Sequence, residues 1–199
     1  MQYALLGDIH SSIDDLQAVL NHISNESPHA ELIGTGDLYE CTVSKKKLHG
    51  QIYSSVNEVI QHPDSFDELL SFLSVYGNQE ERILLITEQE EPLRNVLSNL
   101  PETLNAGRAL VIHGHQWNPE ERDSWLDENM PEEVLVFHGH THQSSFTVDG
   151  NNIRIPVNGE VMLSGKRSVV NVGAVVESRE WVLYDTVENT VKFMKAQKS

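Results

Sequence analysis

The chain has 199 residues, of which 39% are hydrophobic, enough for one domain with a buried core and short for two. It carries 14 basic and 30 acidic residues, so its formal net charge at pH 7 is -16. Such a surface repels nucleic-acid backbones, and we expect no binding to a nucleic-acid duplex. A small phosphorylated substrate is not excluded, because a bound cation inverts the local field.

The compartment is indicated by the cysteine count and by the first residues. The only cysteine, Cys41, excludes a disulfide within the chain, which fits a reducing cytosol. The first apolar run is too short for a signal peptide, and no stretch approaches the ~20 apolar residues of a membrane span. We therefore expect a cytoplasmic protein without a membrane partner, and a homo-oligomer is an open alternative.

The first 142 residues alternate between expected strands and expected helices. Apolar runs predict strands, and apolar positions three or four apart predict helices. In chain order, we expect a strand at 2–7, a helix from Ser11 or Ser12 to Ile23, a strand at 30–34, a helix at 44–61, a short helix at 67–70, a strand at 72–78, a helix at 80–100, a strand at 109–115, a helix at 118–129 and a strand at 133–142.

After residue 143 the pattern changes to short strands broken by turns. Asp149-Gly150 and Asn158-Gly159 are typical turn pairs between strands. Further strands are expected at 168–173, 180–186 and 190–195, and residues 151–164 are expected to form a hairpin beside the polar strand ends. Residues 1–199 are therefore predicted to form a single domain with a mixed sheet system.

The five expected strands of the first part all end in side chains that can bind a metal. These endings contain Asp8, His10, Asp37, Asn78, His113, His115, His140 and His142. Ligand sites in open α/β sheets lie at the carboxyl ends of strands, so neighbouring strands would bring these residues together. The glycines beside them permit a close approach of the backbone.

The residue types narrow the kind of site. Oxygen and nitrogen donors without a thiolate suit manganese, iron, nickel or zinc better than calcium or a structural zinc. The candidates are too many for one ion with an open position and fit two ions that share a bridging carboxylate. Other enzyme motifs are incomplete: Gly34-x-Gly36 lacks the third glycine of a dinucleotide fingerprint, and no Gly-x-Ser-x-Gly occurs.

The motifs Asp-x-His, Gly-Asp, Gly-Asn, His-Gly-His and Gly-His-x-His occur in this order. Over roughly residues 1–175 the chain resembles the calcineurin-like metallophosphoesterases, and Asn171 to Ala174 resemble a late motif of that family. The resemblance is to a compact branch that contains small phosphodiesterases and a retromer subunit. It implies an α/β fold, a four-layer α-β-β-α sandwich of two mixed sheets.

The resemblance also implies the metal ligands. It assigns Asp8, His10 and His142 to a first ion, Asn78, His113 and His140 to a second, and Asp37 as the bridging carboxylate. Manganese is the expected metal, with iron, nickel and zinc as alternatives. Two such ions, about 3.5–4 Å apart, activate a hydroxide that attacks a phosphoester. His138 falls one step before the motif and is expected in a supporting or packing role.

One position departs from the family pattern. Gln79 stands where the family's phosphatases usually have a histidine that protonates the leaving group, and an amide cannot deliver a proton at pH 7. We expect Gln79 and His115 to bind substrate, with His115 and Asn78 as catalytic groups. A phosphodiesterase is therefore favoured over a phosphomonoesterase. The alternative is a protein-docking module on the same fold with little or no catalysis.

Overall fold

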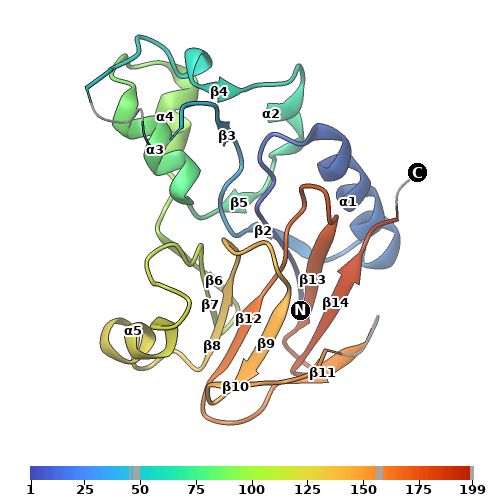
Figure 1. The fold of residues 1–199 in the computed structure, drawn as a ribbon. Coiled ribbons are helices and arrows are strands. Elements are labelled where there is room, and N and C mark those ends of the chain that lie inside the picture. The colour runs from blue at the N-terminus through green and yellow to red at the C-terminus, as the bar shows by residue number, and fades with distance from the viewer. Residues whose placement is uncertain (45, 47–49, 156–158, 198–199) are drawn as a thin grey trace.

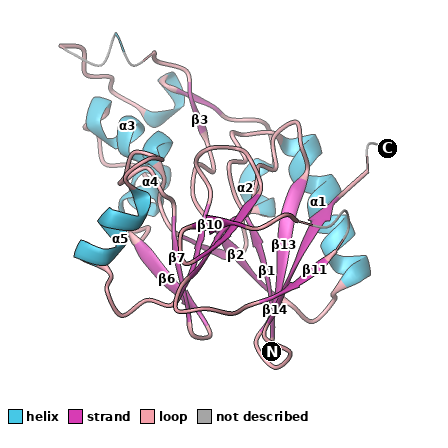
Figure 2. Ribbon diagram, turned by 60° about the horizontal axis from the view of Figure 1, so that its bottom comes forward, coloured by secondary structure: helices cyan, strands magenta, loops and turns pink. Residues whose placement is uncertain are grey.

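The computed structural model describes residues 1–44, 46, 50–155 and 159–197 (Figure 1). Within these residues, two six-stranded sheets pack against each other, and helices cover their outer faces. Figure 2 shows helices α1 (Ile13–Glu26) and α5 (Arg122–Asn129) on opposite sides of the strands. The predicted four-layer α-β-β-α sandwich is confirmed.

The first sheet has the strand order β11-β14-β13-β1-β2-β5. Its strands are β1 (Gln2–Leu6), β2 (Glu31–Gly34), β5 (Leu73–Ser74), β11 (Glu160–Met162), β13 (Glu180–Asp185) and β14 (Thr190–Lys195). The strands β1, β2 and β5 run parallel, whereas β13 is antiparallel to β1. The carboxyl ends of β1, β2 and β5 therefore meet at one edge of this sheet.

The second sheet has the order β10-β9-β12-β8-β7-β6. Its strands are β6 (Thr103–Ala106), β7 (Ala109–Ile112), β8 (Leu135–His138), β9 (Ser145–Val148), β10 (Asn151–Asn152) and β12 (Ser168–Asn171). The central strands β7, β8 and β12 run parallel, so their carboxyl ends also share one edge. Strand β6 was not predicted from the sequence.

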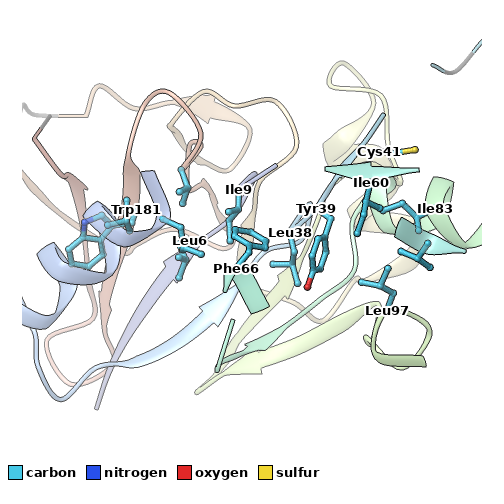
Figure 3. Packing of buried hydrophobic residues seen from close by; sticks show 14 of the residues in the cluster. Leu6, Ile9, Leu38, Tyr39, Cys41, Ile60, Phe66, Ile83, Leu97 and Trp181 are labelled. Carbon is cyan, nitrogen blue, oxygen red and sulfur yellow. The ribbon is translucent and has the colours of Figure 1, made fainter. Parts of the chain in front are cut away.

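Three apolar cores separate the four layers. The middle core lies between the sheets and includes Leu5, Phe137 and Tyr184, whose side chains are at most 2% exposed. On the outer face of the first sheet, Leu16 and other apolar residues of α1 are buried, and Figure 3 shows Trp181, Phe66 and Leu97 along this core. A smaller core joins the second sheet to α5.

The predicted helix at 44–61 is wrong, although residues 45 and 47–49 lie outside the described residues. The chain forms β3 (Glu40–Cys41), a short 3₁₀ helix η2 (Val56–Glu58) and β4 (Ile60–Gln61), and β3 pairs with β4. Val56, Val59 and Ile60 are β-branched and are buried in the core on the outer face of the first sheet, whereas Ile52 stays 55% exposed.

The predicted helix at 80–100 is interrupted. Helix α3 (Asn78–Ile86) starts earlier than expected, which shortens the predicted strand 72–78 to β5, and α4 (Pro92–Ser98) follows after extended residues. Pro92 lacks an N–H and forces the residue before it into extended backbone, so the first helix cannot continue through it. The short helix α2 (Phe66–Leu69) lies close to its predicted position, and α5 starts four residues later than expected.

The hairpin predicted at 151–164 is also wrong. Strand β10 pairs with β9 in the second sheet, whereas β11 pairs with β14 in the first sheet. The segment therefore crosses from one sheet to the other, and its residues 156–158 lie outside the described residues. In the part of the chain that the structure describes, no helix combines the length and the apolar character needed to traverse a bilayer.

Candidate metal centre

The predicted ligands lie in sharp turns at the carboxyl ends of β1, β2 and β8. Left-handed φ values between 49° and 73° occur at Asp8, His10, Asp37, His140 and His142. This conformation costs about 1–2 kcal/mol for a residue other than glycine, and such strain concentrates at functional sites. The turns hold one another: the backbone N–H of Asp8 donates to the Gly36 carbonyl at 3.0 Å.

Six predicted ligands form two groups, and within each group the ligand atoms lie within 4.8 Å of one another. One group consists of Asp8, His10 and His142, and the other of Asp37, His113 and His140. The Asp37 Oδ2 atom lies 3.7 Å from His10 Nε2 and 3.4 Å from His113 Nε2. A carboxylate between two ligand groups is the arrangement that a bridging ligand requires, and the ligand roles themselves stay predictions.

The seventh predicted ligand belongs to the second group by position. Asn78 is the first residue of α3, and its side-chain oxygen Oδ1 lies 3.3 Å from His113 Nε2. The start of this helix, and not a strand as the sequence predicted, therefore directs the Asn78 amide toward the centre.

An unpaired buried oxygen tests whether these residues fit a cation. Asp8 is fully buried, and its Oδ1 has no hydrogen-bond partner in the described part of the chain. The Nε2 atom of His142 lies 3.5 Å from this oxygen, and burial raises the pKa of Asp8 to about 7. A buried carboxylate is costly unless it is paired or binds a metal. The residues therefore fit divalent metal ions, whose positive charge would satisfy this oxygen.

The histidine rings are oriented by acceptors behind them. The Nδ1 atom of His113 lies 2.7 Å from the Thr35 carbonyl, and that of His10 lies 2.6 Å from Glu40 Oε2. In both rings Nε2 is left to face the centre, as a ligating histidine requires. Burial opposes protonation of His113, but the adjacent Asp37 carboxylate raises its pKa to about 9. Binding of a cation would therefore release a proton from this ring.

Two glycines leave room for the carboxylates. A Cβ atom at Gly77 would lie 2.2 Å from Asp37 Oδ1, and one at Gly139 would lie 2.6 Å from Asp8 Oδ2. Neither position has space for a side chain. Glycine at these strand ends is thus a packing requirement of the centre, as the motifs indicated.

The role of Glu80 was not predicted from the sequence, which indicated only that this residue begins a helix at 80–100. Glu80 is fully buried and accepts hydrogen bonds from the backbone N–H groups of Asp37, Leu38, Tyr39 and Gly77 at 2.8–3.2 Å. It therefore fixes the turn that carries Asp37. The signal was its place as the third residue of α3, where glutamate commonly accepts a backbone N–H.

Asn171 is a second residue whose role only the structure reveals. Its Nδ2 donates to the Gly139 carbonyl and to Thr141 Oγ1, both at 2.8 Å. These bonds hold the turn that carries His140 and His142. The late Asn-Val-Gly-Ala motif thus supports the last ligand loop.

The predicted substrate residues lie close to the centre. The Gln79 side chain is 7% exposed, and its Oε1 accepts hydrogen bonds from the Cys41 N–H and from Arg82 Nη1, both at 3.1 Å. His115 lies beside His113 and bonds Glu81 Oε2 at 3.1 Å, and burial lowers its pKa. The substrate contacts of both residues and the proton-transfer role of His115 stay predictions.

His138 lies in the core behind the centre. Its ring meets Trp117 edge to face, with centroids 5.5 Å apart, and burial lowers its pKa to about 3. His138 is therefore a neutral packing residue that belongs to neither ligand group.

A cavity of about 560 Å³ opens onto the two groups. It is lined by His10, Asp37, Glu40, Gln61, Asn78, Gln79, His140, His142, Val176 and Glu177. His115 is absent from these lining residues. A further cavity of about 600 Å³ is lined by residues such as Asp123 and Arg167 and contains no predicted ligand.

Comparison with known proteins agrees with this geometry. The profile of the calcineurin-like phosphoesterase superfamily domain matches residues 1–188. The crystal structure of a metallophosphoesterase from Sphaerobacter thermophilus superposes with a TM-score of 0.73 at 18% identity, covering 100% of this chain and 89% of that chain. A predicted phosphoesterase from Streptococcus pneumoniae gives a TM-score of 0.50 at 17% identity, covering 98% of this chain and 89% of that chain.

One curated sequence is also similar. A protein of Acanthamoeba polyphaga mimivirus described as BTB/POZ domain-containing is 27% identical over 156 residues, which cover 70% of this chain and 19% of that protein. The chain thus spans about a fifth of the length of this relative. The structural likenesses establish the fold, and the profile match establishes the family.

Proposed function

Because this chain belongs to the calcineurin-like phosphoesterase superfamily, we propose that it hydrolyses a phosphodiester with two divalent metal ions, manganese being the preferred metal. The observation that carries the proposal is the Asp37 carboxylate between two groups of ligand side chains, 3.7 Å from His10 and 3.4 Å from His113. A binding module without catalysis has no need for two such groups around one cavity.

When bound, the two ions would supply positive charge to the phosphoryl oxygens and an activated water. Asp8, His10 and His142 would hold one ion, Asn78, His113 and His140 the other, and Asp37 both. Glu40 and the Thr35 carbonyl keep the two histidine rings in place. An Asn78 amide whose oxygen binds the ion can direct its N–H groups toward the phosphoryl oxygens.

The preference for a diester rests on charge and on the leaving group. No lysine or arginine is found among the described residues that line the cavity. A phosphomonoester carries close to two negative charges at pH 7, whereas a diester carries one. The second negative charge of a monoester would therefore find no positive side chain in the cavity beyond the two ions. Gln79 cannot protonate a leaving group, so reactive esters should be the better substrates.

Removal and return of the metal tests the proposal. After treatment with chelator, the protein should not hydrolyse bis-p-nitrophenyl phosphate, and Mn²⁺ should restore turnover more strongly than Ni²⁺, Zn²⁺ or Mg²⁺. The diester should exceed p-nitrophenyl phosphate by about tenfold in kcat/KM, a difference of about 1.4 kcal/mol. A faster monoester would contradict the diester preference. Two bound ions without any turnover would support the docking module instead.

Replacement of Gln79 by histidine tests the leaving-group argument. Gln79→His should raise kcat for alkyl phosphodiesters by about 100-fold, because general acid catalysis contributes at least this much. Activity on p-nitrophenyl diesters should change little, since their leaving group needs no proton. Gln61→His is a matched control at another lining position of the cavity and should not produce this selective gain. Equal effects on both ester types would count against the argument.

A further inference from the structure

The side chain of Gln79 lines the cavity and is bound from behind by two donors. Its Oε1 accepts hydrogen bonds from the Cys41 N–H and from Arg82 Nη1, both at 3.1 Å. Its Nε2 forms no hydrogen bond with any residue that the structure describes, and it is not sealed from solvent. The amide nitrogen of Gln79 is therefore accessible to a ligand in the cavity.

The two donors decide which end of the Gln79 amide faces the cavity. The oxygen and nitrogen ends of a glutamine side chain have nearly the same shape, so only their hydrogen bonds distinguish them. In the opposite orientation, the NH₂ group would face the Cys41 N–H and the Arg82 guanidinium, which can only donate. Oε1 is thus directed toward these two groups, and the N–H bonds of Gln79 are left for a ligand.

Arg82 is itself held in place by a second bond. It follows Gln79 by one turn of α3, and its Nη2 donates to the Val43 carbonyl in the segment after β3. Helix α3 and strand β3 lie side by side (Figure 1), so the guanidinium joins them. Because this group is planar and donates in two directions, it can hold an acceptor at a fixed place. The described lining residues do not include Arg82, which reaches the cavity through Gln79.

The backbone of Gln79 connects this amide to the metal centre. Its N–H donates to Asp37 Oδ1 at 2.8 Å, and Asp37 Oδ2 is the oxygen that lies between the two ligand groups. A phosphodiester at this centre would bring phosphoryl oxygens into the same cavity, and these oxygens are acceptors. A neutral N–H donor suits the single negative charge of a diester.

We propose that Arg82 is a positioning residue for the phosphodiester, because it holds the Gln79 amide so that Nε2 donates a hydrogen bond to a phosphoryl oxygen. This inference rests on the proposed function and adds a residue that acts on the substrate through another side chain. Without Arg82, the Cys41 N–H would remain as a donor to Gln79 Oε1. The amide would therefore be held less firmly and would not be released completely.

A double-mutant cycle on these two residues provides the test. With Mn²⁺ supplied and bis-p-nitrophenyl phosphate as the substrate, Gln79→Leu should raise KM about 10- to 100-fold, as expected for a hydrogen bond to a charged group. Arg82→Met should raise KM about three- to tenfold, the effect expected when a side chain must be immobilised on binding. In the Gln79→Leu background, Arg82→Met should change KM by less than about twofold.

The kinetic constant that changes is part of the prediction. A contact that the substrate makes both when bound and in the transition state alters KM, so kcat should stay within about twofold in each variant. Gln79→Glu keeps the bonds from Cys41 and Arg82 but presents a negatively charged acceptor to the cavity. It should therefore raise KM more than Gln79→Leu does, and a wild-type KM would overturn the donor role.

Arg94→Met is the matched control. Arg94 also binds backbone carbonyls through its guanidinium: Nε donates to Thr87 and Nη2 to Leu84, both at 3.2 Å. The described lining residues of the cavity do not include it, so this variant should leave KM unchanged. Circular dichroism checks that each variant is folded.

A measurement without turnover reports on the amide itself. In ¹⁵N NMR spectra of the metal-free protein, the side-chain NH₂ signals that disappear in Gln79→Leu identify Gln79. These signals should move in Arg82→Met and keep their positions in Arg94→Met.

The outcomes separate the two proposals. An equal rise of KM on Arg82→Met in both backgrounds would show that Arg82 does not act through Gln79, and would overturn the inference. A fall of kcat at unchanged KM, or NH₂ signals that do not move in Arg82→Met, would also overturn it. No hydrolysis by the wild-type protein with any metal would overturn the proposed function itself, and the NMR signals would still show whether Arg82 holds the Gln79 amide.

Discussion

Replacement of Asp37 by asparagine is expected to abolish metal-dependent turnover, with kcat reduced about 1000-fold or more, which corresponds to about 4 kcal/mol. Asp37 Oδ2 lies between the two ligand groups, and Oδ1 accepts the Gln79 N–H at 2.8 Å. An asparagine loses the negative charge that would attract both ions. The NH₂ group of the asparagine would also take the place of one carboxylate oxygen. It would face either the metal ions, which it cannot bind, or the Gln79 N–H, which is itself a donor.

Metal titration by calorimetry and hydrolysis of bis-p-nitrophenyl phosphate measure this effect. Asp37→Asn should weaken the binding of both ions, whereas the loss of a ligand that serves one group should weaken mainly one. The control is Asp64→Asn, which alters an exposed aspartate outside the lining of the cavity. Normal turnover by Asp37→Asn, with two ions bound, would contradict the bridging role.

Replacement of Glu80 by glutamine is expected to destabilise the protein by about 3 kcal/mol or more. The Glu80 carboxylate accepts four backbone N–H groups, two of them from Asp37 and Gly77 beside the metal centre. A glutamine has one acceptor oxygen, and its NH₂ would face backbone donors inside the core. Some of these buried N–H groups would therefore lose their partner.

Thermal unfolding with and without Mn²⁺ tests this second prediction. Glu80→Gln should lower the Tm by about 6–12 °C for a chain of this size. It should also weaken metal binding by about 10- to 100-fold, because the loss of groups that orient a ligand has effects of this order. Glu128→Gln, at an exposed position of α5, is the control and should change neither. Wild-type stability and metal affinity in Glu80→Gln would show that Glu80 does not hold the Asp37 turn.

Some of the predictions failed where local patterns competed with long-range contacts. The spacing of Val56, Val59 and Ile60 suits a helix, but the structure buries the same residues in the core from a short 3₁₀ helix and a short strand. Pro92 could have indicated the interruption, since proline restricts the residue before it. The prediction of one helix at 80–100 followed the helical periodicity instead. The segment 151–164 has turn pairs typical of a hairpin, and its strands nevertheless join different sheets.

The sequence by itself determined the fold family and the set of candidate ligands. Metal-capable side chains recur after apolar runs, from Asp8 to His142, and parallel strands bring such endings to one edge. Only the tertiary structure decided how these residues are grouped around Asp37, that Glu80 holds its turn and that Arg82 bonds to the Gln79 side chain. The reason is physical. Hydrophobic periodicity shows only which face of a segment is buried, whereas the hydrogen bonds of the centre join residues that are far apart in the sequence. Asp37 and Glu80, for example, are 43 positions apart.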